Sequence, residues 1–139
     1  MKHQALLKYY SKELISHIQH IYKGDPATYE LDIADDIAVD IETAIPLGLI
    51  INEIASNFFK HCRPNDGERR ACLIHASIDA ENNYHIKYSD NGTEYPVDID
   101  LENVETLGLE LIQSLTDQIN GSFNFYNDNG VVYEINFKL

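Results

Sequence analysis

The chain has 139 residues, of which 44% are hydrophobic and 24% charged, as expected for one globular domain with its own core. Its formal net charge of −13 excludes the large basic surfaces that bind nucleic acid or anionic membranes, so we expect neither partner. An anionic small ligand would need local help from a metal ion, a helix N-terminus or a well-placed Lys or Arg. Two cysteines, Cys62 and Cys72, lie in apolar runs and are expected to be buried, reduced thiols of a cytoplasmic protein. We find neither a signal peptide nor an apolar run long enough to cross a bilayer.

The first part of the chain predicts one helix and two short strands. Residues 4–22 repeat apolar side chains with a helical period, and Gly24 and Pro26 are expected to end that helix. The following segment, TYELDIADDIAVDIE, alternates twice between apolar and polar residues. A turn at Asp35 and Asp36 separates the two alternating runs, which predicts two strands.

The segment IPLGLIINEIASNFFKHC, residues 45–62, predicts a helix with Thr43 as its N-cap and Pro46 in its first turn. One side of this helix is apolar and is expected to be buried: Leu47, Ile51, Ile54, Ala55, Phe58 and Cys62. The other side carries four polar residues in one file, spaced i, i+4, i+7 and i+8: Glu53, Asn57, Lys60 and His61. This file favours the wall of a pocket for a polar ligand, and the alternative is an ordinary amphipathic helix with a narrow exposed edge.

Two further alternating segments, residues 72–78 and 84–88, predict strands joined by a hairpin turn at residues 81–83. They follow the loop RPNDGERR. The next stretch, about residues 90–105, is acidic and has no periodicity. Loops of this length often act as mobile lids over a site, so we expect a lid here.

The end of the chain predicts a second core helix and a last hairpin. The helix begins at Leu107 and ends at Gly121, and the hairpin turns at Asn129 and Gly130. The chain contains no internal repeat and no linker. Helices alternating with antiparallel hairpins predict an α+β fold, a two-layer sandwich whose mixed, mostly antiparallel sheet carries helices on one face.

The triplet DNG occurs twice, at residues 90–92 and 128–130. The second copy directly joins two alternating segments, so a tight hairpin turn explains it completely. The first copy follows a strand and leads into the long acidic stretch instead. A simple turn is one interpretation of the first copy, and a binding loop is the other.

Three segments in this order, IPLGLIINEIASNFFKHC, YSDNGTEYP and TLGLELIQSLTDQINGSFNF, closely resemble the catalytic, ATP-binding domain of sensor histidine kinases. The likeness covers nearly the whole chain. It implies the Bergerat-type ATP-binding fold, which gyrase and the mismatch-repair ATPases share. It also implies ATP and Mg²⁺ as cofactors.

The resemblance assigns roles to the polar file of the first motif. Asn57 matches the asparagine whose side-chain oxygen ligates Mg²⁺, an ion that prefers oxygen ligands. Glu53 matches the catalytic position that orients or deprotonates the attacking group. Lys60 matches a cation that faces the phosphates and takes part in catalysis. His61 corresponds to a position beside the nucleotide.

The other two motifs imply the remaining nucleotide contacts. Asp90 matches the aspartate that accepts a hydrogen bond from the adenine amino group, and Gly92 lets the backbone pass close to the base. Leu107, Gly108 and Leu109 match the box at a helix start whose N–H groups meet the phosphates. The sequence departs from the pattern Asp-x-Gly-x-Gly, because Glu94 replaces the second glycine while Pro96 stays in register.

The resemblance implies a protein-histidine kinase that transfers the γ-phosphoryl group of ATP to a histidine on a dimerisation domain absent from this chain. Residues 1–24 resemble the tail of a dimerisation helix, and residues 25–139 the ATP-binding domain under a lid of residues 91–106. The implied partners are that dimerisation domain and a downstream response regulator. The resemblance implies a cytoplasmic location, and it is compatible with a parent protein that is membrane-anchored. The alternatives are an anti-sigma-factor serine kinase and a degenerate, non-catalytic interaction module of the same fold.

Overall fold

The structure is a computed structural model that describes residues 4–22, 27–65, 67–92 and 108–139. Its described residues form three helices and seven strands. In chain order they are β1 (Gln4–Leu6), α1 (Leu7–Ile21), β2 (Ala27–Ile33), β3 (Ala38–Asp40), α2 (Ile41–His61), β4 (Arg70–Ile78), β5 (Asn83–Asp90), α3 (Leu109–Gln118), β6 (Ser122–Asn127) and β7 (Val131–Lys138).

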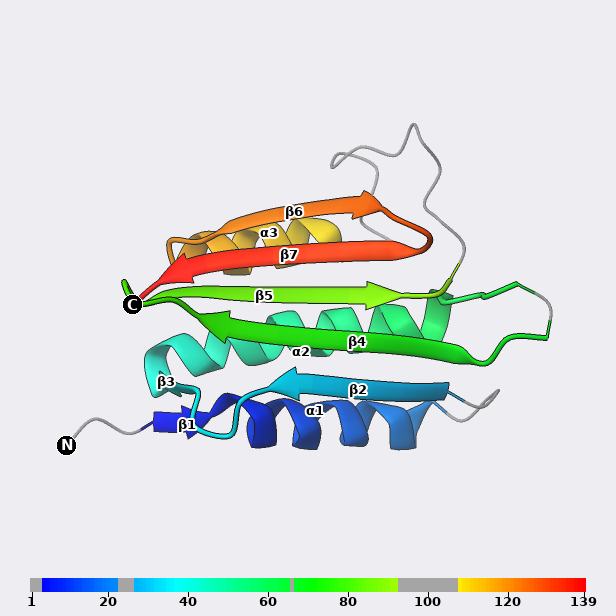
Figure 1. Cartoon of the computed structure of the whole chain (residues 1–139), viewed down its shortest axis with the longest axis horizontal. Helices are drawn as coiled ribbons and strands as arrows, with labels where there is room; N and C mark the ends of the chain where they lie inside the picture. Colours follow the sequence, from blue (N-terminus) through cyan, green and yellow to red (C-terminus); the bar gives the residue numbers. More distant parts are fainter. Residues whose placement is uncertain (1–3, 23–26, 66, 93–107) are drawn as a thin grey trace.

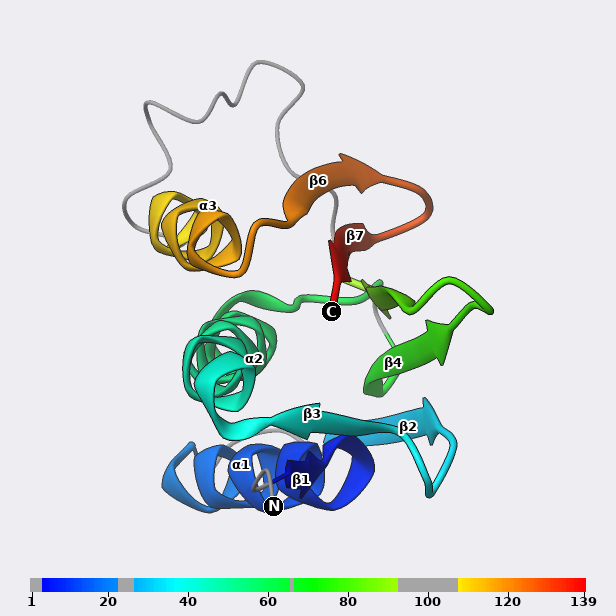
Figure 2. The ribbon, with the colours of Figure 1, turned by 90° about the vertical axis from the view of Figure 1, so that its left-hand side faces the viewer.

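Five of the strands form one sheet in the order β2-β4-β5-β7-β6 (Figure 1). β2 pairs parallel with β4, and the other three pairs are antiparallel. Figure 2 shows all three helices on one side of this sheet. The predicted α+β sandwich, with a mixed, mostly antiparallel sheet and helices on one face, is therefore confirmed.

The core lies between α2 and the inner face of the sheet. Alternate residues of β4, β5 and β7 point inward because side chains alternate along a strand. The inward residues meet the apolar side of α2, and among them are Ile74, Tyr88, Tyr133, Leu47 and Phe58, each at most 3% exposed. Burial of each such side chain contributes ~1.5–3 kcal/mol. This packing fixes the polar file of α2 relative to the ends of the strands.

The start of α2 differs from the prediction. The N-cap is Asp40, whose side chain accepts a hydrogen bond from the Thr43 backbone N–H at 2.8 Å, so the prediction of Thr43 was wrong. Because the helix begins at Ile41, Pro46 lies beyond its first turn. An aspartate caps well because its carboxylate satisfies an N–H group of the first turn that has no partner within the helix.

The prediction of a helix over residues 4–22 was wrong at its start, because Gln4–Leu6 form β1, which pairs antiparallel with β3. Three residues are too few for apolar spacing to separate a strand from a helix. The next two predicted strands are present as β2 and β3, but they belong to different sheets.

Helix α1 packs on α2 and shares its core, to which it contributes Leu7 and Ile15, both at most 2% exposed. Whether residues 1–24 continue a dimerisation helix stays a prediction, but α1 folds as part of the same unit as the sheet. Most of the predicted lid of residues 91–106, including Glu94 and Pro96, lies outside the described residues, and so does Leu107 of the predicted phosphate-binding box. None of the helices that the structure describes is both long and apolar enough to span a membrane.

Candidate functional site

The four residues of the polar file of α2 differ in how far they are exposed. Glu53 is half-buried and Asn57 is only 8% exposed, while Lys60 and His61 in the last turn are exposed. The Lys60 ammonium lies 5.5 Å from the centre of the Tyr22 ring, at the end of α1. The helical period therefore placed the four residues correctly along α2, but the long Lys60 side chain leans toward α1.

Glu53 lies against Gly108, the residue that directly precedes α3. A Cβ added to Gly108 would be 3.2 Å from the Glu53 carboxyl carbon and would overlap its Oε2. Gly108 also has a φ of +68°, in the left-handed region that favours glycine. The left-handed backbone thus favours glycine here, whereas the flexible end of the Glu53 side chain could shift away from a Cβ. The contact places a carboxylate of α2 at the positive end of α3, where negative charge is stabilised. Leu109, the first residue of α3, is fully buried.

Asp90, the last residue of β5, is held by three hydrogen bonds. Its Oδ1 accepts from the backbone N–H groups of Gly92 at 2.9 Å and Val131 at 3.1 Å. Its Oδ2 accepts from the Tyr88 hydroxyl at 2.6 Å. Burial, and after it the charge of Asp90, raises the pKa of Tyr88 well above its usual value, so the phenol stays protonated and acts as the donor.

The two DNG triplets meet at this carboxylate. Val131 follows the second triplet directly, and a Cβ added to Gly130 would overlap the backbone carbonyl oxygen of Asp90 and lie 2.8 Å from its carbonyl carbon. The hairpin turn between β6 and β7 is present as predicted, but it is not the whole explanation of the second triplet. The contact joins residues 41 positions apart, so local sequence patterns could not reveal it.

Asn91 attaches the end of β5 to the start of β4, and Gly92 lies against the end of α2. The Asn91 side chain accepts from the Ala71 backbone N–H at 2.9 Å and donates to the Arg69 carbonyl at 2.8 Å. A Cβ on Gly92 would be 3.0 Å from the Cys62 Sγ. The chain at Gly92 thus passes close to the end of α2. That Gly92 lets the backbone pass close to a base stays a prediction.

Two thiols and one imidazole around this junction are held in their neutral forms. Burial raises the pKa of the Cys62 thiol to about 12, and burial also raises the pKa of Cys72. Both cysteines are buried and free, as predicted. Burial first, and then the charges of Lys60 and Arg63, lower the pKa of His61, so its ring is neutral at neutral pH.

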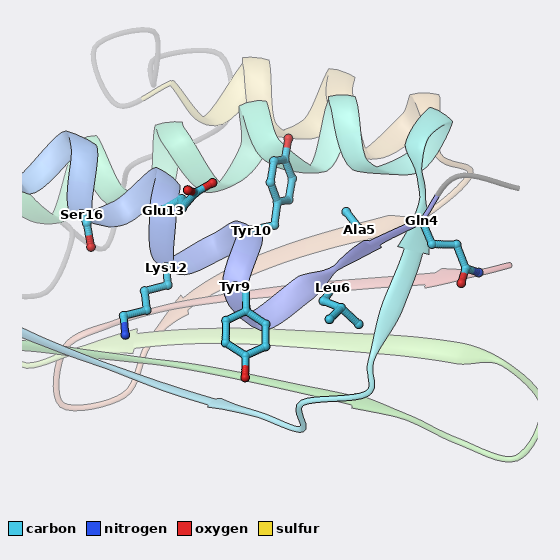
Figure 3. A pocket seen from close by; sticks show the side chains of 8 residues that line it. All are labelled: Gln4, Ala5, Leu6, Tyr9, Tyr10, Lys12, Glu13 and Ser16. Atoms are coloured by element: carbon cyan, nitrogen blue, oxygen red, sulfur yellow. The ribbon is translucent and has the colours of Figure 1, made fainter.

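A separate hollow of about 810 Å³ lies along α1 and β1, and none of the predicted site residues lines it. Figure 3 shows Tyr10 reaching toward α2, where its hydroxyl donates to the Ala44 carbonyl at 3.0 Å, while Tyr9 and Lys12 extend away from α2. The predicted site residues lie instead on α2, at the end of β5 and at the start of α3.

Comparison with solved structures shows that this fold is the fold of histidine kinase catalytic domains. The histidine kinase domain of the blue-light-activated histidine kinase EL346 of Erythrobacter litoralis aligns with a TM-score of 0.82 and 22% identity, over 96% of this chain and 61% of that chain. The nucleotide-free catalytic domain of histidine kinase ThkA aligns with a TM-score of 0.80 and 14% identity, over 99% of this chain and 95% of that one. Histidine kinase AdeS of Acinetobacter baumannii aligns with a TM-score of 0.78 and 14% identity, over 99% and 68%.

Comparison of sequences identifies a curated relative of the same kind. The chain is 26% identical over 115 residues to blue-light-activated histidine kinase 2 of Erythrobacter litoralis, which includes 83% of this chain. The chain spans about a third of the length of that relative, 33%. No protein-family profile matches the sequence.

Proposed function

We propose that this chain is the ATP-binding catalytic domain of a two-component sensor histidine kinase, which transfers the γ-phosphoryl group of ATP to a histidine on a dimerisation domain. The fold and the curated relative support the class. The observation that carries the proposal is the junction of the three motifs. Glu53 of α2 lies against Gly108 at the start of α3, and Gly92 after β5 packs against the end of α2. Segments far apart in sequence thus contact α2 at two places, one at Glu53 and one at its end.

The residues present fit a nucleotide. Asp90 would read the base, since its carboxylate is anchored by backbone and side-chain donors and is only partly buried. The backbone N–H groups of the third motif, at Leu107, Gly108 and Leu109, would bind phosphate oxygens. Lys60 and His61 would flank the ligand from the last turn of α2. These assignments follow the motifs and stay proposals.

Asn57 is the proposed magnesium ligand. The described residues contain no cluster of three or more His, Cys, Asp or Glu that could hold a metal. A magnesium ion bound mainly by phosphates and water needs few protein ligands, so one amide oxygen suffices. When bound, Mg-ATP supplies the transferable phosphoryl group and neutralised phosphate oxygens. The chain positions the ligand, and Glu53 would hold or accept the proton of the attacking group, in keeping with phosphoryl transfer as mainly positioning and electrostatics.

The proposal also covers the longer parent protein to which this domain would belong. Its partners would be the histidine-bearing dimerisation domain and a response regulator, and its kinase portion would act in the cytoplasm, whether or not another part anchors it to a membrane. No observation on the described residues favours the non-catalytic module or the serine kinase, and both become outcomes of the test.

The test is a thermal-shift titration with ATP, with and without Mg²⁺. Ligand that binds only the folded state stabilises it by about 2.7 kcal/mol at 100 times its dissociation constant. We expect Asn57→Ala to lose the magnesium-dependent part of the shift. Asn124→Ala, on an exposed residue of the edge strand β6, is the matched control and should keep it. Absence of any shift at millimolar Mg-ATP in the wild type would favour the non-catalytic module.

Transfer itself is tested by adding a histidine-bearing dimerisation domain and radiolabelled ATP. The proposal expects an acid-labile, base-stable phosphate on that domain, because phosphohistidine hydrolyses in acid. An acid-stable phosphate on a protein serine would instead support the serine kinase.

A further inference from the structure

We propose that Tyr88 is a positioning residue that sets how the Asp90 carboxylate reads the purine amino group. This inference rests on the proposed function, and it concerns a residue of the second motif segment to which the resemblance assigned no role. Tyr88 lies two residues before Asp90 on β5, on the same inward face of the strand. Its hydroxyl oxygen is 2.6 Å from the Asp90 Oδ2, the oxygen that neither backbone N–H group reaches.

The hydrogen bonds on Asp90 leave one acceptor position of its carboxylate open to a donor. An ionised carboxylate has about four lone-pair positions, two on each oxygen. Within the described part of the chain, Gly92 and Val131 use both positions on Oδ1, and Tyr88 uses one on Oδ2. The position that remains belongs to Oδ2. One acceptor position suits one N–H donor, such as one N–H of the adenine amino group.

Tyr88 also fixes the plane of the carboxylate. With only Oδ1 anchored, the group could rotate about its last torsion, because that torsion has a broad energy profile. The third bond, to Oδ2, prevents this rotation. The donor is itself immobile, since Tyr88 is 2% exposed and its ring stacks on Tyr133 with ring centres 5.2 Å apart. The remaining lone pair therefore keeps one direction before any ligand arrives.

A preorganised, charged acceptor discriminates between ligands by the donor they present. Wild-type protein should prefer ATP over the triphosphate of purine riboside, which lacks only the 6-amino group, by about tenfold or more because a hydrogen bond to a charged group is lost. In Tyr88→Phe the ring and its packing remain but the anchor on Oδ2 is absent. We expect the preference for ATP to fall by about fivefold.

Tyr84→Phe is the matched control. Tyr84 lies on the same strand and the same face, is 8% exposed, and donates its hydroxyl to the Ala38 carbonyl at 2.8 Å, away from Asp90. Both variants lose one hydroxyl and one hydrogen bond from a buried tyrosine, so both should lose some stability in urea unfolding. Only Tyr88→Phe should change the ratio of the two dissociation constants, measured by calorimetry with each nucleotide.

The outcomes separate this inference from the proposed function. If the wild type binds ATP and prefers it, but Tyr88→Phe keeps the preference or increases it, Tyr88 only fills the core and the inference is overturned. If the wild type binds neither nucleotide, the proposed function fails and the inference fails with it. A reduced preference in Tyr84→Phe of the same size would also overturn it, because general loss of stability would then be sufficient.

Discussion

The two DNG triplets have the same three residues and opposite structural requirements. In residues 128–130, Asn129 has a φ of +55° and Gly130 a φ of +142°, so the hairpin turn itself demands left-handed backbone. In residues 90–92 no φ is positive, and glycine is favoured at position 92 only because the chain passes Cys62 and Arg63 closely. The first aspartate is partly buried and the second is exposed.

The difference shows that a short motif only limits the backbone conformations open to a segment. The residues packed around the segment decide its role. The second triplet turns the chain and, by doing so, delivers the Val131 N–H to the carboxylate of the first. The first triplet ends a strand and presents that carboxylate beside the end of α2. Residues 128–130 therefore support the carboxylate of Asp90, and Asp90 is the group proposed to bind the adenine amino group.

The largest expected effect separates the two aspartates. Asp90→Asn keeps an oxygen for the Gly92 and Val131 N–H groups, but it places an N–H donor where the adenine amino group needs an acceptor. We expect affinity for ATP to fall by about 100-fold, since a charge-assisted hydrogen bond is lost and two donors oppose each other. Asp128→Asn changes the net charge equally and is the control. Equal losses of affinity in a calorimetric titration of both variants would show that Asp90 has no specific role.

A smaller effect, on stability, separates the glycines. In Gly130→Ala the new Cβ overlaps the backbone of Asp90, which cannot move without displacing β5, so we expect a loss of about 2–4 kcal/mol in urea unfolding. Gly67 has a φ of +85° but no atom within 4 Å of an added Cβ, so Gly67→Ala should cost only about 1 kcal/mol of backbone strain. If the two variants lose the same stability, the contact between the triplets contributes nothing.

The fold was predictable because apolar alternation and helical spacing report which side of an element is buried. This worked for β4, β5, β7 and α2, whose buried residues follow the expected periods. Periodicity does not show which strands pair with one another. The prediction of β2 and β3 therefore did not place them in separate sheets. The three residues of β1 were too few to carry a period.

The site was predictable only as far as residues on one element. Helical spacing placed Glu53 and Asn57 together on α2, but it did not reveal that Gly108, far along the chain, meets the Glu53 carboxylate. The Tyr88 hydroxyl was likewise hidden, because an inward tyrosine on a strand has the pattern of an ordinary core residue. Contacts between distant segments depend on packing, which a local pattern does not contain.

The smallest expected effect concerns a third turn, between β4 and β5. Backbone N–H groups of this turn donate to the carboxylate of its own Asp79, as the Val131 N–H after the second DNG triplet donates to Asp90. The Asp79 carboxylate accepts from the backbone N–H groups of Asn83 and Glu81, and these hydrogen bonds, with that from the Asn83 side chain, lower its pKa to about 2. Because the folded-state pKa lies below the unfolded value, the stabilisation is fully present above the ordinary aspartate pKa of 3.8 and is lost as pH falls through about 2. Asp79→Asn should therefore be slightly less stable than wild type near neutral pH, and the difference should vanish at the acid end.

A salt control separates hydrogen bonds from long-range charge. Because hydrogen bonds lower the pKa of Asp79, urea unfolding at ~1 M salt should show the same pH dependence. A difference that disappears in salt would instead assign the effect to the nearby His85, whose ring lies 3.7 Å from the carboxylate.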